Sequence, residues 1–284
     1  MTSSAYQTVA FQGSHGAYSH LACLSTFPDL KPLACTYFHD VFTKAEQDSS
    51  VVGFLPVENS IAGRVAEIHQ LLAHTRLHII REHYQPIVHC LLACPNSSLS
   101  DITTIKSHAQ ALLQCQTIIV RHHWKQVVVS DTASAAAHLA RNPQSHVAVI
   151  ASRLAAELYG LKVLRPSIAD TGHNTTRFIA VHQQESVPAP TIPAITSLVC
   201  RTKNEPSALY RVLGFFAEHQ LNLTRLEGLI DDHRFQQAQF YLDIEGHRLL
   251  PPLKDVLKTL QESCQSLRVL GCYPADSFRT GATS

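Results

Sequence analysis

Short apolar runs alternate with helical patterns over residues 8–182, and this alternation limits the folds that the chain can adopt. The runs have the length and composition of buried strands, and they lie at 9–11, 33–35, 51–55, 77–80, 87–92, 127–129, 147–150 and 178–181. Helical patterns between them cover 60–73, 107–116, 131–140 and 151–159. Such alternation predicts an α/β sheet covered on both faces, which binds ligands beyond the carboxyl ends of its strands.

Three prolines between Pro188 and Pro193 end this pattern and predict a linker, because proline continues neither a helix nor a central strand. Beyond it, strands are expected at 195–202, 222–229, 235–244 and 266–273. Two helices are expected from apolar faces at Leu209, Val212, Leu213 and Phe216, and at Leu253, Val256, Leu257 and Leu260. The β-α-β-β-α-β order is ferredoxin-like. Domains of this kind commonly pair with a copy of themselves, so we expect a homodimer.

The composition is that of a globular chain of 284 residues, with 45% hydrophobic residues, 16% charged residues and a formal charge of +1. No basic stripe favours nucleic acid as a partner. The first residues lack the cationic segment and the apolar core of a signal peptide. No apolar run approaches the ~20 residues of a membrane span. We therefore expect a cytoplasmic protein that binds neither nucleic acid nor membrane.

Neither the eight cysteines nor the 18 histidines follow the spacing of a metal site. Most cysteines lie in apolar or helical runs, as small buried residues do. Cys90 and Cys94 would point the same way from a strand, but no second pair completes a zinc site. No ligand spacing links the histidines His69, His74, His78, His83 and His89. We expect reduced, structural thiols and no bound metal.

Four loops at strand ends carry polar residues that also have ordinary structural explanations. The loop 13–19 has two glycines that permit a tight turn and offer N–H groups to an anion, although it is not a dinucleotide fingerprint. Asn59 or Ser60 would cap the helix that follows. Residues 107–110 have the spacing of a capping box, and Asp131 marks another helix start.

The stretch Asn174-Thr175-Thr176-Arg177-Phe178 brings a hydroxyl, a fixed cation and an aromatic ring to the point where a loop enters a strand. Loops on a rigid sheet are common places for binding and catalysis. Threonine and phenylalanine are also good strand residues. Taken alone, the five residues favour an ordinary strand start.

Taken in order, these stretches resemble the prephenate dehydratase family with a C-terminal ACT domain. The matching stretches are Gly13-to-Ser19, Pro56-to-Gly63, Ser107-to-Leu112, Asp131-to-Ala133, Ala155-to-Leu161 and Asn174-to-Phe178. The resemblance implies a two-lobed, periplasmic-binding-protein-like (type II) α/β catalytic domain over 7–184, a linker over 185–194 and a ferredoxin-like ACT domain over 195–275. It also implies conversion of prephenate to phenylpyruvate in phenylalanine biosynthesis. No cofactor is expected, because aromatisation of the ring drives the reaction.

The resemblance places the essential threonine of the family's Asn-x-Thr-Arg-Phe motif on Thr176, which would protonate the departing hydroxyl. Threonine is a very weak acid, so a hydrogen-bond network has to resupply its proton. The family positions for that network are Asn59, Ser107 and Gln114. Arg177 is the expected ligand of a substrate carboxylate, because it is always ionised. The other substrate-binding positions are Glu58, Ser60, Phe178 and Thr132.

Three positions of the expected catalytic domain depart from the family pattern. Ala109 replaces a proline, Gln70 replaces an aspartate, and Arg64 stands where the residue is normally small. We expect Arg64 on the surface; the alternative is a second carboxylate ligand in the cleft.

The larger departure concerns the ACT domain, where many members bind phenylalanine as a feedback inhibitor. Ser207-Ala208-Leu209 replaces Gly-Ala-Leu, and Glu227-Gly228-Leu229-Ile230 replaces Glu-Ser-Arg-Pro. The regulatory positions are therefore Ser207, Ala208, Leu209 and Glu227. Ser207 places a Cβ where a backbone would approach the ligand closely. The domain then senses phenylalanine or another molecule, or joins the subunits of a homodimer or homotetramer.

Two other functions fit the same residues. Arogenate carries an amino group where prephenate has a keto group, so the product, phenylalanine or phenylpyruvate, distinguishes the two substrates. A non-catalytic sensor of amino acids or aromatic acids is the second alternative. Pure binding, however, would not need the polar set of Thr176, Asn59, Ser107 and Gln114. From the length of the chain we expect no fused mutase or dehydrogenase.

Overall fold

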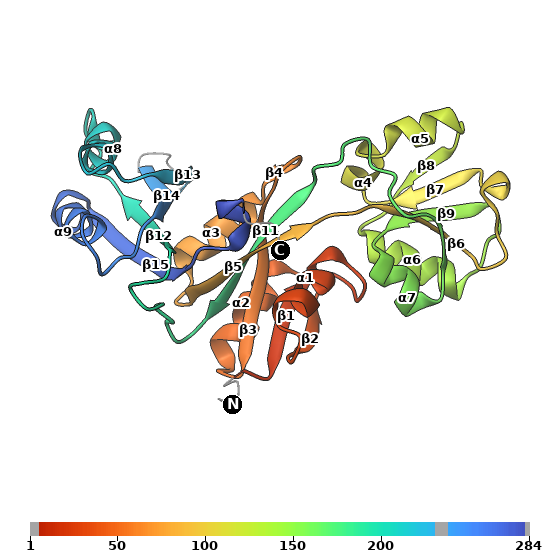
Figure 1. Ribbon diagram of the computed structural model, residues 1–284, viewed down its shortest axis with the longest axis horizontal. Coiled ribbons are helices and arrows are strands. Elements are labelled where there is room, and N and C mark those ends of the chain that lie inside the picture. Colours follow the sequence, from red (N-terminus) through yellow and green to blue (C-terminus); the bar gives the residue numbers. More distant parts are fainter. Residues whose placement is uncertain (1–5, 231–237, 282–284) are drawn as a thin grey trace. The chain divides into compact units, whose positions relative to one another are not determined.

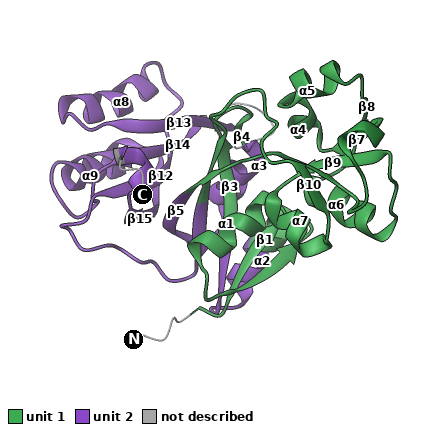
Figure 2. Cartoon of the chain, turned by 45° about the vertical axis from the view of Figure 1, so that its right-hand side comes forward, with its two compact units in different colours: residues 1–41, 54–64, 84–178 green, residues 42–53, 65–83, 179–284 purple. Residues whose placement is uncertain are grey.

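The computed structural model describes residues 6–230 and 238–281. The chain divides into two compact units, which Figure 2 colours separately. Unit 1 comprises residues 1–41, 54–64 and 84–178, and unit 2 comprises residues 42–53, 65–83 and 179–284. The division falls within one helix, α2 (Phe38–Gln47), and within three strands, β3 (Val51–Asn59), β5 (His78–Pro86) and β11 (Thr175–His182).

The first sheet has the strand order β2-β1-β3-β11-β5, and β4 pairs with β3. Its other strands are β1 (Thr8–Gln12), β2 (Lys31–Cys35) and β4 (Gly63–Arg64). The helices connecting its strands are α1 (Tyr18–Thr26), α2 (Phe38–Gln47) and α3 (Ala66–His74). β1 and β2 are parallel, and α1 packs on both of them. The β1–α1 connection therefore leaves from the carboxyl end of β1, where binding residues were expected.

The second sheet has the order β10-β6-β9-β7-β8 and lies between two pairs of helices (Figure 1). Its strands are β6 (Cys90–Ala93), β7 (Thr104–Ser107), β8 (Lys125–Val128), β9 (Val147–Ala151) and β10 (Lys162–Arg165). Its helices are η1 (Leu99–Asp101), α4 (Ala109–Leu113), α5 (Gln116–Arg121), α6 (Thr132–Arg141) and α7 (Arg153–Tyr159). The chain enters this sheet after β5 and returns to the first sheet at β11.

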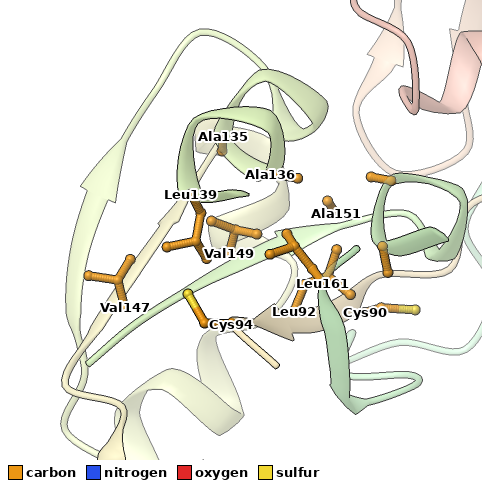
Figure 3. Packing of buried hydrophobic residues seen from close by; sticks show 12 residues of the cluster. Cys90, Leu92, Cys94, Ala135, Ala136, Leu139, Val147, Val149, Ala151 and Leu161 are labelled. Carbon is orange, nitrogen blue, oxygen red and sulfur yellow. The ribbon is translucent and has the colours of Figure 1, made fainter. Parts of the chain in front are cut away.

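Alternating burial along β6 explains why both faces of this sheet are covered. Cys90, Leu92 and Cys94 pack with residues of α6 and α7, as Figure 3 shows in close-up. Leu91 and Ala93 belong to the opposite cluster, with residues of α4 and α5. Successive side chains of a strand point to opposite faces, so a continuous apolar run was the correct sign of a strand buried on both sides. All eight cysteines are buried and free.

The third sheet, in unit 2, has the order β13-β14-β12-β15. Its elements are β12 (Ala194–Arg201), α8 (Ala208–Glu218), β13 (Leu223–Ile230), β14 (Ala238–Glu245), α9 (Leu253–Ser263) and β15 (Ser266–Pro274), with η2 (Ser277–Thr280) after it. Figure 1 shows α8 and α9 on the same side of the sheet, where Val212, Phe216, Val256 and Leu260 join its core. The ferredoxin-like order is confirmed. Residues 235–237 of the expected strand 235–244 lie outside the described residues.

Two helix predictions were wrong at their starts. The helix expected at 60–73 begins only at Ala66, because the Asn59 side chain accepts from two backbone N–H groups and closes a turn instead of capping a helix. The capping box at Ser107 does not form: Ser107 ends β7, and His108 caps α4. The pattern at 107–116 is divided between α4 and α5. Asp131 caps α6 as expected.

The described residues between β11 and β12 contain neither helix nor strand. Among the helices of the described ranges, none is long and apolar enough to span a membrane.

Candidate active site

Thr176 lies near the start of β11 and is buried, with 9% of its surface exposed. Its Oγ1 accepts a hydrogen bond of 2.9 Å from Nδ2 of Asn59, the last residue of β3. β3 and β11 are neighbours in the first sheet, so residues distant in sequence meet where the two strands lie side by side. Both residues belong to unit 1.

Backbone contacts fix the orientation of the Asn59 amide. Its Oδ1 accepts from the N–H groups of Ile61 at 3.0 Å and Ala62 at 2.8 Å. Nδ2 must therefore be the end that faces Thr176, and it also donates to Asn174 Oδ1 at 2.7 Å, with a longer contact of 3.3 Å to the Thr175 carbonyl. Because Thr176 Oγ1 accepts from Asn59, the hydroxyl proton of Thr176 is directed elsewhere.

Hydrogen bonds continue from Asn174 to three further side chains. Asn174 Nδ2 donates to Gln114 Oε1 at 2.8 Å, and His89 Nε2 lies 2.8 Å from the same oxygen. An amide oxygen only accepts, so His89 carries its proton on Nε2. Its Nδ1 then accepts from the Tyr18 hydroxyl at 2.7 Å, and the Val88 carbonyl lies farther from the same hydroxyl, at 3.1 Å. Burial lowers the pKa of His89, against the opposing effect of the Gln114 contact. The imidazole is thus neutral near pH 7.

The structure brings Thr176, Asn59 and Gln114 of the predicted site residues into one hydrogen-bonded set. We call the six residues of this set the amide chain: Thr176, Asn59, Asn174, Gln114, His89 and Tyr18. The sequence analysis gave no role to His89, Tyr18 or Asn174. Asn174 and Tyr18 lie in stretches that carried the family resemblance, whereas a histidine in an apolar run gave no signal of its own.

Ser107 is not brought into the amide chain. It is completely buried, and its Oγ donates to the Ile150 carbonyl at 2.7 Å. This bond links the end of β7 to its neighbour β9.

Arg177 and Phe178 lie close to Thr176 in sequence but have other partners. Arg177 is buried and its Nη1 lies 3.4 Å from Glu58 Oε1. Adjacent strand residues point to opposite faces, so the Arg177 side chain leaves the face that carries the Thr176 hydroxyl. Phe178 stacks on Phe54 with ring centroids 5.1 Å apart and is part of the buried core.

Ser60 fixes the loop before β11. Its N–H donates to the Thr175 carbonyl at 2.9 Å, and its Oγ accepts from the Thr175 N–H at 3.0 Å. The Ser60 hydroxyl also lies 3.4 Å from the His173 carbonyl. These contacts hold the segment after β3 along the segment that begins β11. Arg64 is exposed on β4, as expected.

Thr132 begins α6, directly after the capping residue Asp131. Asp131 Oδ1 accepts from the N–H groups of Ala133 and Ser134, and its Oδ2 accepts from Ser14 Oγ at 3.2 Å. The β1–α1 loop is thereby joined to α6. A cavity of about 600 Å³ borders this contact, with lining residues that include His15, Tyr37, Asp131, Arg141 and Tyr159.

Gly16 has the backbone conformation that only glycine adopts readily, with φ +88°. Its N–H donates to His20 Nδ1 at 3.0 Å, and its carbonyl accepts from Ser152 Oγ at 2.6 Å. The Gly13 N–H donates to the Cys35 carbonyl at 2.9 Å. The glycine N–H groups expected to face an anion are therefore used within the chain.

We expect Gly16→Ala to lower the free energy of unfolding by about 2–4 kcal/mol, which combines the cost of a left-handed backbone with that of an overpacked contact. A Cβ at Gly16 would lie 3.0 Å from Ala155 Cα, where the backbone of α7 cannot move aside easily. Gly160→Ala is the matched control, because Gly160 also has positive φ (65°) but no atom lies within 4 Å of its added Cβ. Urea unfolding should show the larger loss for Gly16; equal losses would contradict the packing explanation.

The predicted regulatory residues lie at the start of α8 and on β13. Ser207 is exposed with φ +65°, and Glu227 pairs with Arg225 at 3.1 Å. A cavity of about 240 Å³ lies nearby, lined in part by Lys203, Ala208 and Arg211. Ser207 and Leu209 are not among its lining residues.

Ser207→Gly should raise the free energy of unfolding by about 1 kcal/mol, because the left-handed conformation costs roughly that much for a residue with a Cβ. Thermal unfolding of the two chains under identical conditions measures the difference. A lower midpoint for the glycine variant would show that the serine side chain stabilises the start of α8.

Comparison with known proteins agrees with this architecture. The prephenate dehydratase family model matches residues 9–186. A bifunctional N-acyl-homoserine lactone acylase/prephenate dehydratase of Komagataeibacter europaeus is 40% identical over 272 residues, which cover 95% of this chain and 97% of the relative. Arogenate dehydratase/prephenate dehydratase 1 of Arabidopsis thaliana is 33% identical over 285 residues, 95% of this chain and 73% of the relative.

The structure of prephenate dehydratase from Arthrobacter aurescens, solved in complex with L-Phe, superposes with a TM-score of 0.88 at 29% identity and covers 94% of this chain and 90% of its own. The fold and this structural likeness define an α/β protein of the periplasmic-binding-protein-like class, with a ferredoxin-like sheet in its C-terminal part. The chain belongs to the prephenate dehydratase family.

Proposed function

We propose that the chain converts prephenate to phenylpyruvate, with loss of carbon dioxide and of the ring hydroxyl. The observation that carries the proposal is the Thr176 hydroxyl, whose oxygen accepts from Asn59 so that its proton is free to reach a substrate. Membership of the prephenate dehydratase family supports the same reaction. The reaction belongs to phenylalanine biosynthesis and makes the chain a carbon–oxygen lyase.

The chemistry requires a proton at one atom. As the bond between the ring and its carboxylate breaks, the electron pair moves into the ring and the carbon–oxygen bond to the hydroxyl breaks at the opposite carbon. Thr176 gives its proton to the departing oxygen, which leaves as water. The overall change consumes one proton, which solvent returns to Thr176. A positioned acid of this kind is worth about 10²–10⁴ in rate.

The amide chain supports Thr176 as an acid by orienting hydrogen-bond donors, not by passing protons from residue to residue. Amide groups do not pass protons readily, so Asn59, Asn174 and Gln114 orient donors rather than transport a proton. The Asn59 N–H points at Thr176 Oγ1 and stabilises the negative charge that grows there as the proton leaves. This replaces the expectation that the network resupplies the proton.

The remaining predicted residues take supporting roles in this proposal. The Arg177–Glu58 contact holds β11 and β3 in place, and Ser60 holds the loop before β11. Ser107 joins β7 to β9 beside the start of α4. Thr132, beside the helix cap Asp131 at the start of α6, is proposed as a further substrate contact.

We further propose residues 7–184 as the catalytic domain, 185–194 as the linker and 195–275 as the ACT domain of a cytoplasmic homodimer or homotetramer. The structure of the Arthrobacter aurescens relative was solved with L-Phe, which supports phenylalanine as an effector here too. Excess phenylalanine should then lower the rate of turnover. A rate indifferent to phenylalanine would leave the ACT domain as a sensor of another molecule or a dimerisation element.

Turnover by the purified chain tests the proposed reaction. Prephenate and arogenate are supplied separately, and phenylpyruvate and phenylalanine are measured. A higher kcat/KM for prephenate, with phenylpyruvate as the product, supports the proposal. A higher kcat/KM for arogenate, with phenylalanine as the product, would make the chain an arogenate dehydratase, as the name of the Arabidopsis relative allows. Turnover of neither substrate would favour a sensor.

The identity of 40% to the Komagataeibacter europaeus relative supports a second candidate activity, hydrolysis of an N-acyl-homoserine lactone. Release of homoserine lactone from an acylated substrate would be followed by mass spectrometry with the same preparation. Release that survives Thr176→Ala would place that activity at a different site, and no release would remove the candidate.

A further inference from the structure

We infer that Tyr18 and His89 are positioning residues that hold the far end of the amide chain, the amides of Gln114 and Asn174, in the orientation that Asn59 requires, and thereby support the Thr176 hydroxyl. This inference rests on the proposed function, because the hydroxyl matters as an acid. Neither residue contacts Thr176: Tyr18 reaches it only through His89, Gln114, Asn174 and Asn59.

The amide chain is directional, because each amide has an oxygen that accepts and a nitrogen that donates. If Gln114 turned its NH₂ group toward Asn174, two donors would face each other unless Asn174 turned as well. Asn174 would then present its nitrogen to Asn59 Nδ2, whose orientation the N–H groups of Ile61 and Ala62 already fix. A single reversed amide would therefore leave mismatched groups within the chain.

His89 decides the orientation at the other end. With its proton on Nε2, it donates to Gln114 Oε1 and keeps that oxygen toward Asn174. With its proton on Nδ1, Nε2 would be an acceptor facing an acceptor, which favours rotation of the Gln114 amide. His89 is 4% exposed, so water has little access to satisfy a mismatched nitrogen.

Tyr18 favours one of the two tautomers of His89. Its hydroxyl has a single proton and lies 2.7 Å from His89 Nδ1 and 3.1 Å from the Val88 carbonyl oxygen. With the His89 proton on Nε2, as the Gln114 oxygen requires, the Tyr18 proton is donated to the nearer acceptor, Nδ1. The rings of Tyr18 and His89 meet edge to face, with centroids 5.4 Å apart and an interplanar angle of 74°. Burial and the neighbouring Cys90 and Cys115 raise the pKa of Tyr18, so its hydroxyl keeps the proton that it donates.

The first test compares Tyr18→Phe, His89→Leu and His89→Gln with the unchanged chain. The first two should lower kcat about three- to tenfold, the worth of one hydrogen bond, with KM changed less than about twofold because neither side chain binds the substrate. The side-chain nitrogen of glutamine is a donor and lies as many bonds from Cβ as Nε2 of histidine does. His89→Gln can therefore donate to Gln114 and should restore most of the rate. An unchanged kcat in Tyr18→Phe and His89→Leu would overturn the inference.

His247→Leu is the matched control for loss of a buried histidine. His247 is 6% exposed, and both of its ring nitrogens have partners, the Pro188 carbonyl at 2.9 Å and the Leu249 N–H at 3.2 Å, away from the amide chain. The kcat of His247→Leu should stay near that of the unchanged chain. Circular dichroism checks that His247→Leu and His89→Leu are both folded when they are assayed. An equal loss of kcat in His247→Leu would mean a general effect on stability and would also overturn the inference.

Nitrogen NMR of the His89 ring gives a readout that does not depend on turnover. The unchanged chain should show the proton on Nε2, and Tyr18→Phe should show a mixture of both tautomers. A proton on Nδ1 in the unchanged chain would overturn the inference even if prephenate is turned over. Conversely, the chain could show the proton on Nε2 and yet fail to turn over prephenate. That result would reject the proposed reaction but would leave the hydrogen-bond assignment standing.

Discussion

Thr176→Ala is expected to lower kcat for prephenate about 10²–10⁴-fold, the usual contribution of a positioned general acid. The substitution removes the Thr176 hydroxyl, whose oxygen accepts from Asn59 and whose proton is directed away from that bond. KM should change little, because the hydroxyl acts mainly as the carbon–oxygen bond breaks. Steady-state formation of phenylpyruvate over a range of prephenate concentrations measures both constants.

Two variants make this prediction specific. Thr176→Ser keeps the hydroxyl and should retain much of the rate. Thr175→Ala removes the neighbouring threonine side chain, which points to the opposite face of β11, and should stay within a few-fold of the unchanged chain. Full activity in Thr176→Ala would show that another group protonates the departing oxygen.

The sheet architecture could be predicted from sequence because it depends on local patterns. The run at 147–150 becomes β9, buried on both faces, and the prolines from Pro188 onward fall where regular structure stops. The start of α3 was missed for a physical reason: Asn59 has the residue type of a helix cap, but its side chain closes a tight turn of three residues instead.

The site was only partly predictable, because hydrogen bonds between distant residues leave no spacing in the sequence. Asn59 and Thr176 could be named from the family motifs, but no local pattern relates His89 to Gln114. Arg177 shows the opposite difficulty. It adjoins Thr176 in sequence, yet strand geometry sends its side chain to the other face, where it meets Glu58. Proximity in sequence and proximity in a site are different quantities on a strand.

Asn59→Asp is expected to lower kcat at least about 10²–10³-fold, as removal of one donor from an oxyanion site does. The aspartate retains an oxygen to accept from the N–H groups of Ile61 and Ala62, so the turn after β3 should persist. The atom that faces Thr176 becomes an oxygen, which cannot donate. The Thr176 hydroxyl would then turn its proton toward the carboxylate, away from the substrate.

A second effect of the same variant acts in the same direction, because a carboxylate beside Thr176 Oγ1 repels the negative charge that grows there. Asn59→Asp therefore removes a stabilising donor and adds an opposing charge, whereas Thr176→Ala removes the acid. Combining the two should cost little more than Thr176→Ala alone, since without the hydroxyl there is no charge for Asn59 to stabilise. Asn96→Asp, the same change at an exposed loop position, controls for the added charge and should leave kcat near that of the unchanged chain. Fully additive losses in the double variant would mean that Asn59 acts on the substrate by a route that does not pass through Thr176.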